Sequence, residues 1–270
     1  MSESFRFADR RVLKIAAIMS MLLDHIGLLW DIPYFRAAGR MAFPIFAFML
    51  LEGYYHTHDV LGYAYRLARV AVIAQIPYAL MKGDAVFFAI LVPALILSCF
   101  DMTLPLGFLL PLVIPTGTFN VLYLFVWGVL MFAYLDGLEK DRAAKAAGTK
   151  SEAPSHRAIS LCVWLGAIPV MLRADYSIVG MVLFLILYYQ RKKSYQSMAV
   201  GMAIWGTVVY GVGFMEPTYI IGALLACVLI ACYNDKPVVL PKWLRIMDYG
   251  FYPAHMLVLW FLHTYAVSLF

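Results

Sequence analysis

Charged side chains are scarce in this chain of 270 residues. Asp, Glu, Lys and Arg make up 14% of it, whereas hydrophobic residues make up 64%. Soluble domains average about 25% charged and about 45–50% apolar residues. The composition therefore excludes an ordinary soluble domain. It predicts an all-α integral membrane protein, because a helix satisfies its own backbone hydrogen bonds within lipid.

Familiar ligand-binding motifs are missing as well. The chain has no Gly-rich phosphate loop, Walker sequence, EF-hand pattern or internal repeat, and no His-x-x-x-His pair, so we expect no metal site. Its net charge of +5 comes from loops, which suits anionic lipid rather than nucleic acid. The four cysteines have neither C-x-x-C nor metal-ligand spacing and are predicted to be small buried side chains: Cys99, Cys162, Cys227 and Cys232.

What the chain does contain is a series of apolar segments spread evenly along it. We read about 9–11 transmembrane spans in a single domain, residues 1–270. The number depends on 86–100 and 104–116, which are short and proline-rich and fit either two spans or a re-entrant hairpin. The predicted helices are 14–30, 38–55, 67–81, 86–100, 104–116, 119–136, 158–172, 176–190, 195–213, 218–233 and 249–268.

The basic residues predict the orientation of these spans. With the N-terminus inside, all but four of the 21 Lys and Arg residues fall on the cytoplasmic side. We therefore expect a cytoplasmic N-terminus without a removable signal peptide and a C-terminus on the opposite side. The one long hydrophilic segment, 138–157, is predicted to be a flexible cytoplasmic loop.

The first span, KIAAIMSMLLDHIGLLW, carries Asp24 and His25 at membrane depth, where ionisable groups are costly and usually functional. His25 is a candidate general base, because histidine exchanges a proton near neutral pH; the alternative is a polar contact between helices. Lys14 precedes His25 by eleven residues, almost three helical turns, so both should share one face about 16 Å apart. Asp24 is expected to pair with Arg40 of the next span as a structural lock.

Other candidates are less specific. Arg66 is a candidate for binding phosphate, although ordinary positive-inside placement also explains it. Asp175 and Tyr176 begin a predicted helix, where Asp175 can simply cap it. His255, in DYGFYPAHMLVLW, is a second histidine predicted to be buried. The candidates for stabilising an oxyanion are Arg40, Gln75 and Tyr252.

Several motifs together resemble the TraX family of conjugal-transfer membrane proteins. They are KIAAIMSMLLDHIG, GRMAFPIFAFMLLEGYYHT, RLARVAVIAQIPYAL, DYSIVGMVLF and LPKWLRIMDYGFYPAHMLVL, in that order. That family is similar in turn to the acyltransferase-3 superfamily, whose catalytic histidine and basic partner would correspond to His25 and Lys14. Two departures stand out: lysine replaces the superfamily's arginine, and the family's N-V-L-F stretch here reads Asn120 to Tyr123.

The resemblance implies a multi-pass acetyltransferase of the bacterial inner membrane, with its C-terminus in the periplasm. Acetyl-CoA would be the donor and the amino terminus of a conjugative pilin the acceptor. From the residues themselves we place His25, Asp24 and Arg40 at the catalytic centre. Substrate contacts would come from Lys14, Arg66, Gln75, Asp175, Tyr176, Tyr252 and His255. The alternatives are an O-acetyltransferase acting on a lipid or envelope glycan, and a non-enzymatic transporter or pilus-assembly scaffold.

Overall fold

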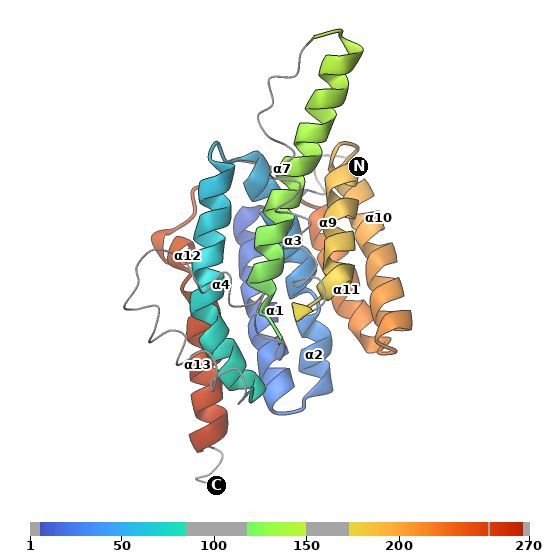
Figure 1. Ribbon diagram of the computed structural model, residues 1–270. Helices are drawn as coiled ribbons and strands as arrows, with labels where there is room; N and C mark the ends of the chain where they lie inside the picture. The colour runs from blue at the N-terminus through green and yellow to red at the C-terminus, as the bar shows by residue number, and fades with distance from the viewer. Residues whose placement is uncertain (1–5, 85–117, 150–172, 248, 267–270) are drawn as a thin grey trace, which may run out of the picture. The chain divides into compact units, whose positions relative to one another are not determined.

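The computed structural model describes residues 6–84, 118–149, 173–247 and 249–266, and these are mostly helical. Figure 1 shows the helices in chain order. Within the described ranges there is no β-strand; two isolated bridges join Ala8 to Tyr233 and Phe119 to Ala174. The predicted all-α class is confirmed for this part of the chain.

The helices divide between two compact units. Unit 1 comprises residues 1–51 and 182–270, and unit 2 comprises residues 52–181, with the boundaries inside α3 and α9. The single domain predicted from composition stays a prediction. The helices are α1 (Arg10–Leu29), α2 (Pro33–Gly39), α3 (Ala42–Tyr55), α4 (Val60–Lys82), α7 (Val121–Ala146), α9 (Ser177–Arg191), α10 (Tyr195–Gly206), α11 (Thr218–Ala231), α12 (Lys242–Ile246) and α13 (Phe251–Phe261), with π-helical turns η2 (Thr207–Gly213) and η3 (Leu262–Ala266).

Among the described residues, three stretches are long and apolar enough to cross a membrane: Arg10–Leu29, Pro33–Tyr55 and Val121–Ala146. The helices Ser177–Arg191 and Thr218–Ala231 are apolar but shorter. Three predicted spans, 86–100, 104–116 and 158–172, lie outside the described residues, as does the choice between two spans and a hairpin.

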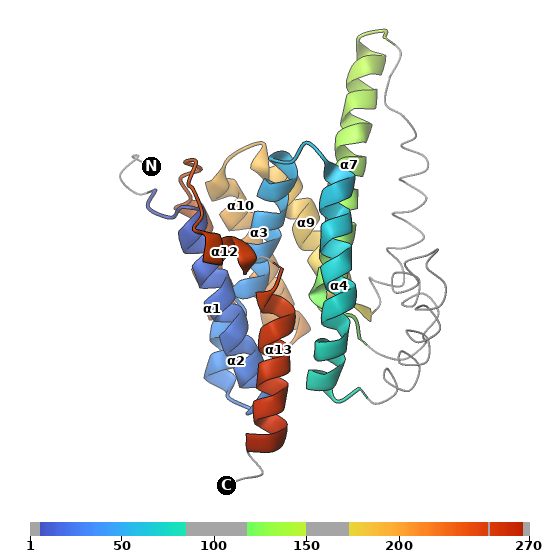
Figure 2. The ribbon, with the colours of Figure 1, turned by 90° about the vertical axis from the view of Figure 1, so that its left-hand side faces the viewer.

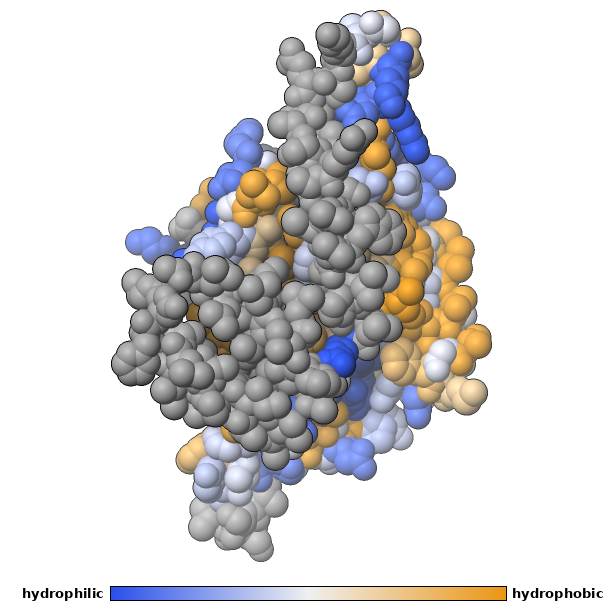
Figure 3. Space-filling model, viewed as in Figure 1, coloured by the Kyte–Doolittle hydropathy of each residue, from blue (hydrophilic) through white to orange (hydrophobic). Residues whose placement is uncertain are grey.

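The surface of α10 and η2 fits a lipid environment. Apolar side chains cover the right-hand side of Figure 3, where Figure 1 places α10. The residues recur every fourth position, so they form one stripe along the helix. More than half of each side chain is exposed: Val200, Ile204, Val208 and Val212. Such a stripe is unfavourable in water and favourable against acyl chains.

Several predicted helix starts differ from the structure; the span predicted from residue 14 already begins at Arg10, where Asp9 caps it. The span predicted at 38–55 is two helices, α2 and α3, interrupted at Arg40. The helix predicted to begin at 67 begins at Val60, because the Asp59 carboxylate caps it by accepting from the Gly62 backbone N–H at 2.8 Å. Hydropathy missed residues 60–66 because they include a glycine, two tyrosines and Arg66 and are less apolar than the rest of a span.

The predicted loop 138–157 is wrong in its first nine residues, because α7 continues to Ala146. Residues 138–146, LEKDRAAKA, contain strong helix formers and an Asp141–Lys145 spacing that favours a helix. The absence of an apolar period indicated exposure, but an exposed segment can still be helical. The part of the predicted loop beyond residue 149 lies outside the described residues.

Candidate active site

The buried face of α1 carries the candidate base. Lys14, Ile18, Met21 and His25 follow one another at spacings of four, three and four residues, and all are buried. The opposite side exposes Met19, at 52%. The predicted common face of Lys14 and His25 is therefore confirmed. Lys14 is only 2% exposed, so its amine lies inside unit 1.

His25 meets a second histidine, from α13. The distance between His25 Nδ1 and His255 Nε2 is 2.6 Å, and the two rings are nearly parallel with centroids 4.9 Å apart. Both residues are buried, with 9% and 6% of their surface exposed. Figure 2 shows α1 and α13 side by side in unit 1, running in the same direction.

The sequence of α13 explains why His255 faces α1. Its buried residues are Tyr252, His255, Met256 and Leu259, which follow the three- and four-residue spacing of one helix face. His255 Nδ1 lies 2.7 Å from the carbonyl oxygen of Phe251, one turn earlier. The Tyr252 ring lies edge-on to both histidines, with centroids 6.5 Å from His25 and 5.9 Å from His255. The structure thus brings together three of the predicted site residues.

The carboxylate of Asp24, next to His25, binds two arginines, Arg36 and Arg40, which we call the arginine clamp. The predicted Asp24–Arg40 ion pair is confirmed, and Arg36 donates a second charged hydrogen bond to the same carboxylate at 2.9 Å. Arg36 was missed, although its position four residues before Arg40 places both on one helix face. Arg40 also packs over the Tyr219 ring, at 5.3 Å from the centroid. These contacts support the structural lock; a catalytic role for Asp24 or Arg40 stays a prediction.

Close backbone contact between α1 and α2 sets the geometry of this clamp. A Cβ atom on Gly39 would lie 2.3 Å from Asp24 Cβ, and one on Gly27 would lie 2.7 Å from the Arg36 backbone nitrogen. The Ser20 hydroxyl donates to the backbone carbonyls at the end of α2, at 2.8 and 3.0 Å. The small residues of α2 permit this close approach, and Ser20 and Gly27 are the α1 partners that the sequence did not reveal.

Comparison with known proteins identifies the family of this chain. The family model described as TraX protein matches residues 9–263. The chain belongs to the TraX family. It is also similar to the probable fimbrial assembly protein FimC, serogroup H1, of Dichelobacter nodosus, with 39% identity over 75 residues. That match covers 26% of this chain and 31% of the relative. No solved structure matches the chain.

The remaining candidates of this TraX-family chain belong to unit 2. The side chain of Gln75 donates to the Thr118 carbonyl at 2.9 Å and accepts from Asn120, so it joins α4 to the start of α7. Arg66 is exposed and packs over the Tyr63 ring, with its guanidinium carbon 6.0 Å from the centroid. Their predicted roles in substrate binding stay predictions.

Asp175 and Tyr176 precede α9, which begins at Ser177. The Asp175 backbone N–H donates to the Phe119 carbonyl at 3.0 Å, and Tyr176 has a left-handed backbone, with φ of 65°. The two residues thus form a tight turn into α9. Their roles in substrate binding also stay predictions.

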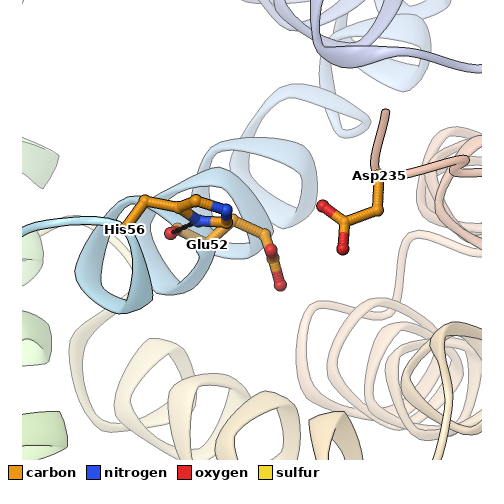
Figure 4. A group of neighbouring side chains, drawn as sticks. All are labelled: Glu52, His56 and Asp235. Carbon is orange, nitrogen blue, oxygen red and sulfur yellow. Dashed lines mark hydrogen bonds between the residues drawn. The ribbon is translucent and has the colours of Figure 1, made fainter. Parts of the chain in front are cut away.

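The end of α3 places Glu52 and His56 one turn apart, as Figure 4 shows. His56 Nδ1 lies 2.7 Å from the Glu52 backbone carbonyl oxygen. Glu52 is 7% exposed, whereas His56 is exposed. This contact ties the ring to its own helix.

Proposed function

We propose that this chain is a membrane-embedded acyltransferase that moves an acetyl group from acetyl-CoA to an amine, with His25 as the general base. The observation that carries the proposal is the buried His25–His255 contact. A buried imidazole held by a second one can take and return a proton where water is scarce. Membership of the TraX family supports the assignment, because the motifs that resemble this family include both histidines.

The proposed reaction needs one proton carrier. His25 removes a proton from the acceptor nitrogen as that nitrogen bonds to the thioester carbonyl carbon. The C–S bond then breaks, and the thiolate of CoA leaves with the proton that His25 returns. An oxyanion forms in between, and the Tyr252 side chain is the candidate donor that lies beside His25 in unit 1.

The proposed acceptor is the amino terminus of a pilin in the bacterial inner membrane. The similarity to a probable fimbrial assembly protein supports a substrate of this class. We further propose a cytoplasmic N-terminus and a periplasmic C-terminus. The asymmetry of Lys and Arg supports this orientation, as does the common direction of α1 and α13 in Figure 2. Lys14, on the same face of α1 as His25, is a proposed contact for the donor.

The test is acetyl transfer by the purified protein in lipid nanodiscs, with radiolabelled acetyl-CoA and a peptide carrying the pilin amino terminus. His25→Ala should reduce transfer by at least about 100-fold, the lower range for loss of a general base. The exposed His58→Ala is the matched control and should keep the wild-type rate. Full activity of His25→Ala would refute the mechanism, and acetylation of a lipid or glycan instead of the peptide would refute the acceptor.

A further inference from the structure

We infer that His255 is a positioning residue that holds the proton of neutral His25 on Nδ1 and leaves the Nε2 lone pair as the base. The inference rests on the proposed function only for its catalytic consequence. The arrangement of protons follows from the hydrogen bonds themselves.

The chain of hydrogen bonds begins at a group that only accepts. The Phe251 carbonyl oxygen lies 2.7 Å from His255 Nδ1, and a carbonyl has no proton to give. His255 Nδ1 must therefore carry the hydrogen. A neutral imidazole has a single N–H, so His255 Nε2 is an acceptor.

The direction of the next hydrogen bond follows. His25 Nδ1 lies 2.6 Å from His255 Nε2, a distance that requires one proton between the two nitrogens. Because His255 Nε2 accepts, His25 Nδ1 donates. Neutral His25 is then protonated on Nδ1 and has its lone pair on Nε2, the nitrogen that points away from His255.

The same arrangement also suits the proton transfer. When His25 Nε2 takes a proton, the Nδ1–H bond to His255 persists and becomes charge-assisted, which strengthens it. His255 therefore stabilises the imidazolium without giving up its own proton. Because both histidines are buried, bulk water is poorly placed to replace this partner.

Two amide substitutions separate this role from simple packing. The amide group of glutamine reaches the place of an imidazole Nε2, whereas that of asparagine reaches only the place of Nδ1. The glutamine in His255→Gln can therefore accept the hydrogen bond from His25 Nδ1. The shorter asparagine in His255→Asn can reach only the Phe251 carbonyl. We expect kcat to fall about 10–100-fold in His255→Asn and His255→Leu, as for other residues that orient a functional histidine, with KM unchanged. His255→Gln should stay within about threefold of wild type. Equal rates for the glutamine and asparagine variants would overturn the role of His255.

A measurement without substrate tests the proton arrangement independently. In protein labelled with ¹⁵N-histidine, ring nitrogen shifts distinguish protonated from unprotonated nitrogens, and the signals of His25 are those absent from His25→Ala. We expect wild-type His25 to show a protonated Nδ1 and an unprotonated Nε2, and His255→Leu to show a mixture. A wild-type His25 protonated on Nε2 would overturn the inference. The expected spectrum from a protein that transfers no acetyl group would refute the proposed function alone.

Discussion

The substitution Asp24→Asn separates the structural role of the acidic residue from the chemistry of its histidine neighbour. The Asp24 carboxylate binds Arg36 and Arg40, and the three side chains are only 15%, 22% and 11% exposed. Asparagine keeps the shape but removes the charge, which leaves two guanidinium groups close together without a counter-ion.

The expected cost follows from this burial. Breaking a fully buried ion pair costs about 3–5 kcal/mol, and the partial exposure of this clamp reduces the loss to about 2–4 kcal/mol. For a protein of this size, a loss of 2 kcal/mol lowers the unfolding midpoint by at least about 4 °C. The catalytic rate per folded molecule should fall by less than about tenfold, because His25 and His255 keep their contact.

The first assay is thermal unfolding in detergent, monitored through cysteine accessibility or intrinsic fluorescence. The second is the acetylation rate, normalised to the amount of folded protein. Asp9→Asn is the matched control on the same helix. Asp9 caps α1 and pairs with Arg11, whose side chain is 52% exposed, and asparagine caps as well as aspartate. The control should lose less than about 0.5 kcal/mol. An Asp24→Asn midpoint within 1 °C of wild type, together with a rate reduced more than about tenfold, would refute the structural reading.

Two further substitutions test the packing. Gly39→Ala places a methyl group 2.3 Å from Asp24 Cβ, so the midpoint should fall by several degrees, whereas Gly213→Ala, with its nearest contact at 3.9 Å, should leave it unchanged. Equal midpoints would contradict the close approach of α1 and α2. Asn120→Ala removes a fully buried amide that donates to Ala71 and Gln75 and caps α7, which should cost about 2–3 kcal/mol in denaturant unfolding. A loss below about 0.5 kcal/mol would contradict that network.

Hydropathy and charge were enough to predict the helical class, the membrane setting and most helix positions in the described residues. Lipid requires long, continuous apolar helices, and this requirement is visible in composition alone. The starts of α3 and α4 and the length of α7 were harder to predict. They depend on the break after α2, on the Asp59 cap of α4 and on exposed helix formers in α7, which hydropathy does not detect.

The individual site residues were also visible in the sequence, because His25, Asp24, Arg40 and His255 are ionisable groups in apolar segments and therefore stand out. Their relations were visible only in part. The shared face of Lys14 and His25 follows from helical periodicity along one segment.

The Asp24–Arg40 pair was predicted from the sequence, but only the tertiary structure decided the other contacts across helices. His25 and His255 are 230 residues apart, and their contact depends on α13 packing against α1. The second arginine on Asp24 depends on glycines that let two backbones approach within side-chain distance. The residues of a single helix determine which of its faces is apolar. The angle and distance at which two helices pack depend on side chains from both, which lie far apart in the chain.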